Sequence, residues 1–249
     1  MTQATLAPMD AQHLSELAEL EDGYWWHVAK RQLAVKLLAR FAPPPGVLIE
    51  GGVGSSRNLL EFRRLGYDVT GLDVMPEAVD LARERGIDGV RLHDLEEPWP
   101  VAEGSVKAVV LLDVIEHLAS PVNALEHAWR ALQPGGALVV TVPAYPWLYG
   151  DWDRALGHYR RYTAPLLREQ AAQAGFHVRR LTHWNSFTLP AAIAVRGWRR
   201  LVPRPGAAEF PRVSTFTNRL LQGCAAAERV LIGRVPVPCG LSLVGVLVK

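Results

Sequence analysis

The stretch from Val47 to Leu60 reads VLIEGGVGSSRNLL, and the interpretation of the whole chain starts from it. An apolar run ends in the acidic residue Glu50, glycines and small residues follow, and the segment then opens into a helical pattern. These features predict a strand, a tight turn and the start of a helix. In an α/β protein, a turn of this kind at the end of a strand is where a nucleotide-like ligand binds.

The composition fits one large domain, because the chain has 249 residues and 49% of them are hydrophobic. The charge is divided unequally. Residues 1–150 hold 12 Lys and Arg against 20 Asp and Glu, a net charge of −8, whereas residues 151–249 hold 15 against 5, a net charge of +10. Two interpretations stay open: the second half faces an anionic partner, or it carries a solvated basic surface.

The two cysteines, Cys224 and Cys239, are too few for a disulfide framework, so we expect a reduced, cytoplasmic protein. Residues 1–20 contain no basic-then-apolar leader, and no window reaches about 18 apolar residues, so neither a signal peptide nor a membrane-spanning helix is expected.

Strands and helices are predicted to alternate along most of the chain. A helical segment at 11–41 precedes the first strand, and Pro43 to Gly46 separate the two. Alternating apolar strands and helices predict an α/β fold, a doubly wound sheet with helices on both faces. We divide this single domain into an N-terminal helical cover, a core, an insert or lid, and a final strand, at 1–45, 46–184, 185–237 and 238–249. The predicted strands lie at 47–50, 67–73, 89–93, 105–113, 137–142, 176–184 and 241–249, and the later helices at 55–65, 76–85, 121–132 and 164–174.

The glycine turn does not fit the two best-known phosphate loops. A Walker loop needs a Lys after its last glycine, and a dinucleotide-binding turn needs a third glycine, and both are missing here. Glu50 would repel a pyrophosphate and attract an ammonium group. This favours a ligand with a cationic amino acid end and a ribose, and S-adenosylmethionine fits that description.

Two more acids follow the next two predicted strands. Asp73 lies 19 residues after Gly54, where its carboxylate could accept hydrogen bonds from both ribose hydroxyls. Asp94 follows the third strand and could face the adenine amino group. Each acid alone could equally be a helix N-cap or a surface charge, but the three in order at this spacing favour a ligand site at the carboxyl edge of the sheet.

On these residues the chain resembles the class I S-adenosylmethionine-dependent methyltransferases, and it is similar to the bacterial group that includes ubiquinone-biosynthesis O-methyltransferases. The segment EGGVGSS matches the family's first motif except that Ser56 replaces its last glycine. Residues 111–143, the segments YWWHVAKR and GHYRRYT, and the run His93-Asp94-Leu95 also match. The resemblance implies a Rossmann-like sheet of seven strands, with the last strand antiparallel and inserted beside the sixth.

The resemblance also implies which residues contact the cofactor, S-adenosylmethionine. The Ser55 or Ser56 hydroxyl could bond the ligand's carboxylate, and a small shift of the turn is expected at Ser56. The implied set is Glu50, Gly52, Gly54, Ser55, Asp73, Val74, Asp94, Leu95, Leu112 and Asp113.

In such enzymes the methyl group moves in one in-line displacement, and an oxygen or nitrogen nucleophile usually needs a base. His117 is the first candidate base, with Glu116 and His158 beside it as further catalytic candidates. The alternative for His117 is a structural histidine beneath the cofactor.

Asp113, Glu116 and His117 have i, i+3, i+4 spacing and would share a face if the segment were helical. Two carboxylates and an imidazole could hold a divalent cation, with His158 as an added ligand. Some ubiquinone O-methyltransferases have a comparable run and use a metal, but many relatives carry the Glu-His pair without one, and we expect no metal.

Candidate acceptor contacts fall in two segments. Tyr159, Arg160 and Arg161 follow the fifth strand, and Arg beside Tyr suits a phosphate or carboxylate, although these arginines could simply be exposed. Tyr24 and Trp25 could cover a ligand or form a core staple. Residues 187–204 are apolar first and basic after, which suits a peripheral membrane contact, a lipid-like acceptor or a packed lid helix.

The sequence therefore predicts a biosynthetic S-adenosylmethionine-dependent methyltransferase acting on oxygen or nitrogen of a small-molecule acceptor, anionic or lipid-like. One alternative keeps the cofactor but changes the chemistry, as in carboxymethyl-transferring or cyclising relatives. Another is a binding module without catalysis, which Ser56 would suit. A nucleic-acid substrate is not expected, because the chain has no added binding module and no NPPY-type motif. The sequence gives no oligomeric state.

Overall fold

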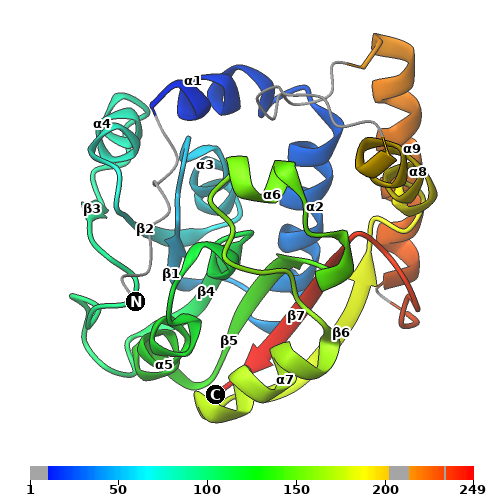
Figure 1. The fold of residues 1–249 in the computed structure, drawn as a ribbon. Coiled ribbons are helices and arrows are strands. Elements are labelled where there is room, and N and C mark those ends of the chain that lie inside the picture. Colours follow the sequence, from blue (N-terminus) through cyan, green and yellow to red (C-terminus); the bar gives the residue numbers. More distant parts are fainter. Residues whose placement is uncertain (1–10, 202–212, 233) are drawn as a thin grey trace, which may run out of the picture.

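The computed structural model describes residues 11–201, 213–232 and 234–249, and these form a seven-stranded sheet with helices on both faces (Figure 1). The strand order is β3-β2-β1-β4-β5-β7-β6; β1 to β5 are parallel, and β7 runs antiparallel to β5 and β6. This confirms the predicted fold, including the last strand inserted beside the sixth. The strands are β1 Gly46–Gly51, β2 Tyr67–Asp73, β3 Val90–Leu92, β4 Val106–Leu112, β5 Leu132–Pro143, β6 His177–Trp184 and β7 Ser242–Val248.

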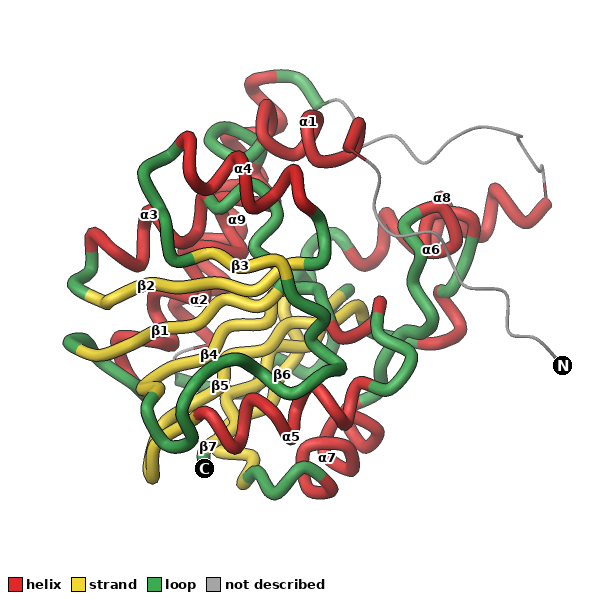
Figure 2. The backbone as a smooth tube through the Cα atoms, turned by 90° about the vertical axis from the view of Figure 1, so that its left-hand side faces the viewer, coloured by secondary structure: helices red, strands yellow, loops and turns green. Residues whose placement is uncertain are grey.

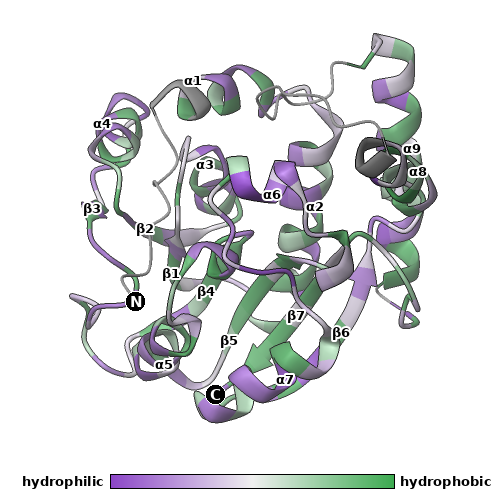
Figure 3. Ribbon diagram, in the orientation of Figure 1, coloured by the Kyte–Doolittle hydropathy of each residue, from purple (hydrophilic) through white to green (hydrophobic). Residues whose placement is uncertain are grey.

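The parallel strands are buried on both faces, so their residues alternate between two cores. Leu48 and Val110 point to the core on one face, which is completed by α2, α3, α4 and α9, whereas Ile49 and Leu111 point to the other core, beneath α5 and α7. Figures 2 and 3 show these layers and the hydrophobic strands between them. The helices are α1 Ala11–Leu20, α2 Trp25–Phe41, α3 Arg57–Arg64, α4 Pro76–Glu84, α5 Pro121–Ala131, α6 Asp151–Ala155, α7 Ala164–Gln173, α8 Leu189–Leu201 and α9 Thr215–Ile232.

The predicted single helix at 11–41 is wrong, because the chain turns between α1 and α2. The backbone N–H groups of Gly23 and Tyr24 both donate to the carbonyl of Leu20. Asn218 of α9 holds the turn from outside: its Oδ1 accepts from the backbone N–H of Trp25 (2.8 Å), and its Nδ2 donates to the carbonyl of Gly23 (2.8 Å). A side chain nearly 200 residues away therefore satisfies the first turn of α2.

The aromatic residues at the start of α2 form a packed cluster. The Trp26 ring stacks on the Trp184 ring of β6, with the centroids 4.7 Å apart, and Trp25 meets Phe187 edge-on at 5.8 Å. Because Trp25 is only 8% exposed, the core staple describes it better than the predicted acceptor cover.

The predicted insert at 185–237 contains α8 and α9, and its residues 202–212 lie outside the described structure. α9 packs along α2, and Glu228 of α9 accepts hydrogen bonds from the backbone N–H groups of Asn185 and Ser186 (2.6 and 2.8 Å). Within the described ranges, none of the helices combines the length and apolar character needed to cross a bilayer.

Candidate functional site

The glycine turn lies where β1 ends, beside the end of β2, as parallel strands require. Gly52 has φ of +67°, and a Cβ there would lie 2.7 Å from Val114, so a side chain is excluded on both counts. The backbone N–H of Gly54 donates to Asp73 Oδ2 (3.1 Å), and that of Met75 donates to Oδ1 (2.9 Å). Asp73 therefore fixes the turn.

Ser56 has a left-handed backbone conformation, which usually favours glycine. Its φ of +61° lies in the left-handed region, and its buried hydroxyl has no hydrogen-bond partner among the described residues. Ser56 is therefore strained, and the shift of the turn stays a prediction.

Replacing Ser56 with glycine should raise the free energy of unfolding by about 1 kcal/mol, because a side chain in this region is strained. Chemical denaturation measures this difference. Ser105→Gly, at an exposed site before β4, is the control, and it should not raise the free energy of unfolding. A Ser56→Gly variant no more stable than the parent would show that the surroundings already compensate the strain.

Ser55 is engaged by the N-terminal helical segment. Its hydroxyl donates to the carboxylate of Glu21, which also pairs with Arg85 (2.7 Å). Leu17 of α1 lies against Gly54 from the same side. The Ser55 hydroxyl is thus occupied within the protein, and the predicted contact between this hydroxyl and a ligand carboxylate is not what the structure favours.

Glu50 is 1% exposed at the end of β1, beneath the glycine turn. Asn58 Nδ2 donates to its Oε1 (2.8 Å), whereas Oε2 has no partner among the described residues. Burial raises the pKa of this carboxyl to about 8, although the Asn58 hydrogen bond acts in the opposite direction.

The other predicted cofactor residues divide into two groups. Val74 and Asp94 are exposed beyond the ends of β2 and β3, and Asp94 Oδ1 accepts from the N–H of Glu96 (2.9 Å). Leu95 and Leu112 are buried in the two cores, so these positions offer a ligand mainly their backbone groups.

Asp113 follows β4 with φ of +57°, and its carboxylate is fully engaged by two neighbours. Lys30 Nζ of α2 donates to Oδ2 (2.9 Å), and Thr141 Oγ1 of β5 donates to Oδ1 (2.8 Å). Burial acts to raise the pKa of Asp113, but the Lys30 ammonium outweighs it and holds the pKa below its usual value. Lys30 was missed from the sequence because it lies 83 residues away.

The α-helical face predicted for Asp113, Glu116 and His117 does not form. Asp113 is not helical, and only Ile115–His117 form a short 3₁₀ helix, η1. The groups that converge are instead Glu116, His117 and His158, with one ligand atom of each within 4.8 Å of the others. The two imidazole rings stand edge to face at 4.6 Å.

The pKa values of Glu116 and His117 in this cluster are shifted in opposite directions. Glu116 is fully buried, and neither carboxylate oxygen has a partner among the described residues. Burial, followed by the charge of Asp113, raises the pKa of Glu116 well above its usual value. Burial, followed by repulsion from His158, lowers the pKa of His117 to about 4.

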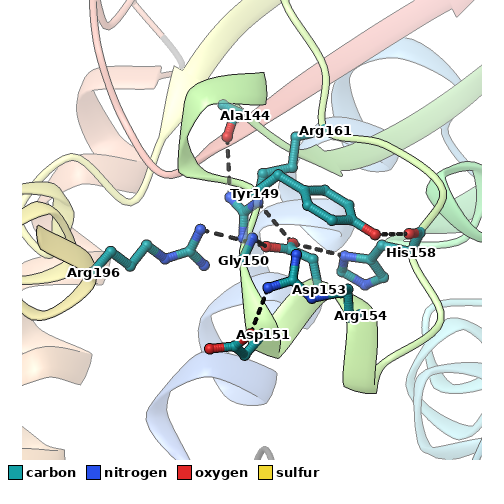
Figure 4. A network of polar contacts seen from close by, with 9 residues as sticks. All are labelled: Ala144, Tyr149, Gly150, Asp151, Asp153, Arg154, His158, Arg161 and Arg196. Atoms are coloured by element: carbon teal, nitrogen blue, oxygen red, sulfur yellow. Dashed lines mark hydrogen bonds and ion pairs between the residues drawn. The ribbon is translucent and has the colours of Figure 1, made fainter. Parts of the chain in front are cut away.

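Asp153 of α6 organises His158 (Figure 4). Its Oδ1 lies 3.0 Å from His158 Nδ1 and accepts from Arg161 Nε (2.7 Å), while its Oδ2 accepts from the backbone N–H of Gly150 (3.0 Å). Arg196 of α8 approaches the same carboxylate at 3.5 Å. A buried carboxylate on Nδ1 favours the tautomer with its proton there and leaves Nε2 as the basic nitrogen.

The predicted acceptor contacts after β5 are largely engaged within the protein. Arg161 donates to Asp153 and to the carbonyl of Ala144 (3.0 Å), and Arg160 donates to the carbonyls of Leu118 and Ala119 (both 2.9 Å). Both guanidinium groups brace the loops around the histidine cluster, so an acceptor-binding role is not favoured for either. Half-buried Tyr159 lies beside the cluster, and its N–H donates to the carbonyl of Glu116 (2.8 Å).

Comparison with known proteins agrees with this arrangement. A model of the methyltransferase domain matches residues 25–181. The chain belongs to the methyltransferase domain family. With its sheet topology, this places it among the class I S-adenosylmethionine-dependent methyltransferases, as the glycine turn and the strand-end acids predicted.

This methyltransferase domain is similar to the ubiquinone biosynthesis O-methyltransferase of Xanthomonas campestris pv. campestris (strain B100), with 26% identity over 153 residues. The match covers 56% of this chain and 64% of that relative, less than two thirds of its length.

Solved structures share the fold. The [4+2]-cyclase SpnF has a TM-score of 0.60 and 20% identity, over 98% of this chain and 97% of that one. The 1,6-didemethyltoxoflavin-N1-methyltransferase of Burkholderia thailandensis, solved with 1,6-didemethyltoxoflavin and S-adenosylhomocysteine, has a TM-score of 0.55 and 18% identity, over 98% of this chain and 92% of that one.

The residues of the methyltransferase domain fit S-adenosylmethionine. The unpartnered Oε2 of Glu50 suits an ammonium donor, and the carboxylate of Asp73 suits ribose hydroxyls. The exposed Val74 offers an apolar contact for an adenine ring. These three groups lie along the same edge of β1 and β2.

Proposed function

We propose that this protein transfers the methyl group of S-adenosylmethionine to a hydroxyl group of a small-molecule acceptor. The observation that carries the proposal is the Asp153–His158 pair, which lies beyond the end of β4, at the same sheet edge as the glycine turn. When bound, S-adenosylmethionine supplies an activated methyl group. The protein has to orient the acceptor, exclude water and accept one proton.

His158 suits the role of base better than His117. A general base works best with a pKa near the working pH, and the low pKa of His117 makes that histidine a weak base. Asp153 orients His158 and stabilises the imidazolium that forms when Nε2 takes the acceptor's proton. Lys30 and Asp113 form the wall beside this cluster, and the Lys30 ammonium favours an acceptor whose oxygen develops negative charge.

The direct test is transfer of radiolabelled methyl from S-adenosylmethionine to a panel of phenols, catechols and amines, with and without a carboxylate. Labelling of hydroxyl acceptors supports the proposal. Labelling of amines alone would contradict O-methylation, and bound cofactor with no transfer to any acceptor would favour a binding module or another chemistry.

Removing the Asp73 carboxylate should weaken S-adenosylmethionine binding by about 30- to 100-fold, because two hydrogen bonds to a charged acceptor are lost and the turn loses its anchor. Calorimetry with Asp73→Ala measures the effect, and Asp80→Ala, an exposed acid on α4, is the matched control. Equal affinities in both variants would refute the ribose assignment.

A second candidate mechanism uses a divalent cation held by Glu116, His117 and His158. The buried, unpartnered carboxylate of Glu116 beside two imidazoles favours it, and the Asp153–His158 pair matches the carboxylate support that histidine ligands receive. This mechanism requires that EDTA abolish methyl transfer and that added Mg²⁺ or Mn²⁺ restore it. We expect activity indifferent to EDTA, because the Asp153–His158 pair can take the acceptor's proton without a metal.

We also propose that the insert contacts a membrane surface. Ile193, Val195 and Trp198 of α8 are 42%, 53% and 60% exposed, and Phe216 of α9 is 78% exposed. Residues 202–204 of the predicted 187–204 segment lie outside the described structure. Flotation with anionic vesicles tests this surface, and unchanged binding of a Trp198→Ala, Phe216→Ala variant would rule it out.

A further inference from the structure

A groove with a volume of about 540 Å³ lies across the outer side of α2, between α3 and α9. Four cationic side chains line it, namely Arg31 and Lys36 of α2, Arg57 of α3 and Arg229 of α9, against a single acid, Glu61. None of these residues belongs to the glycine turn or to the histidine cluster, and the groove lies on the helical layer rather than at the carboxyl edge of the sheet.

Three of the four cations make no direct ion pair within the described part of the chain. Among the described residues, no carboxylate lies within 4.0 Å of the charged groups of Arg31, Lys36 or Arg229; only Arg57 has such partners, Asp22 at 2.5 Å and Glu61 at 3.5 Å. Lys36 instead donates to a backbone carbonyl and Arg229 to an amide side chain, both at 2.5 Å.

Among these cations, Arg31 gives the strongest evidence for an anion site. It is only 7% exposed, and its one described hydrogen bond goes from Nη1 to the carbonyl of Glu21 (3.1 Å). Arginine is almost never buried to this extent without a paired charge, because removing a cation from water is costly. Burial, followed by repulsion from Arg57, lowers the pKa of Arg31, whereas the charges of Asp22, Glu61 and Glu21 act in the opposite direction.

We propose that this groove binds the phosphate group of a small molecule. A phosphate carries up to two negative charges and several acceptor oxygens, which match the planar donor forks of two arginines and the point charge of a lysine. The volume lies in the range of small-molecule sites, and Val35 and the arginine and lysine stems give the groove an apolar portion. The bound anion supplies the direct ion pair that Arg31 lacks among the described residues.

Calorimetric titration of the full chain with inorganic pyrophosphate tests the site. We expect saturable binding that weakens with added salt, and at least a tenfold loss of affinity in the double variant Lys36→Gln, Arg229→Gln. Arg168→Gln, an exposed charge on α7 across the sheet, should bind like the parent. Arg31→Met serves as a second variant, with thermal unfolding to confirm folding, and should lose the upward shift in Tm that pyrophosphate gives the parent.

Sedimentation with phosphatidylglycerol vesicles identifies the source of the phosphate. Vesicle binding that pyrophosphate displaces and the double variant lacks assigns the site to a lipid headgroup, whereas pyrophosphate binding without such vesicle binding assigns it to a soluble compound. The proposal is overturned if the parent does not bind pyrophosphate at millimolar concentration, or if the folded double variant binds it as tightly as the parent.

Discussion

The variant His158→Ala should lower kcat for methyl transfer by about 100- to 10,000-fold while leaving the affinity for S-adenosylmethionine within threefold of the parent. In the proposed mechanism His158 is the base, and Asp153, buried and 3.0 Å away, orients it, so the variant loses the group that takes the acceptor's proton. Initial rates with an acceptor from the panel and calorimetry with the cofactor measure the two quantities separately.

Two further variants, His117→Ala and His177→Ala, serve as comparisons for this result. His177 is exposed on β6, so its replacement should leave kcat unchanged. His117 touches His158, so its replacement should lower kcat by less than tenfold through altered packing. If His117→Ala is the more damaging change, then His117 is the base and His158 its support. If both changes act mainly on cofactor affinity, the pair has a structural role instead.

The variant Glu50→Gln should change how stability depends on pH. The folded-state pKa of Glu50 is raised from 4.5 to about 8, so between these values the folded protein keeps a proton that the unfolded chain releases. The free energy of unfolding of the parent therefore falls as pH rises through this window. The glutamine variant lacks this loss. Its free energy of unfolding should equal that of the parent near pH 4.5 and exceed it by up to about 4 kcal/mol near pH 8.5.

Denaturant unfolding at several pH values measures this difference, with Glu61→Gln, a half-buried acid on α3, as the control. The cofactor adds a second measurement, because an ammonium beside Glu50 would favour its charged form. Binding of S-adenosylmethionine at pH 7 should then release up to about one proton, seen as a dependence of the calorimetric enthalpy on the buffer. A proton release that persists in Glu50→Gln would show that another group is responsible.

Much of the cofactor edge could be predicted from sequence because its parts are local. Each strand-end position is fixed by the end of an apolar run, and parallel strands bring their carboxyl ends to one edge whatever the helices between them do. Glu50, Gly52 and Asp73 therefore lie where the pattern predicted. Ser56 is the exception within this stretch, since its left-handed backbone could be seen only in the structure.

The partners of these residues depended on tertiary structure. Lys30 meets Asp113 across 83 positions, and Glu21 meets Ser55 across 34, and neither pair has a spacing that a periodic pattern can reveal. The i, i+3, i+4 spacing after β4 suggested a helical face, but the positive φ of Asp113 turned its side chain towards Lys30 and Thr141.

The sequence by itself determined the sheet, its carboxyl edge and the class of cofactor, because hydrophobic period and glycine placement act over a few residues. Only the tertiary structure decided which acid lies against which histidine. Asp153 was missed because its role comes from burial beside His158 and Arg161, and burial of a single charged residue is set by every element packed around it. The same holds for Arg31, whose burial without a direct ion pair among the described residues becomes visible only once α1, α2 and α3 are assembled.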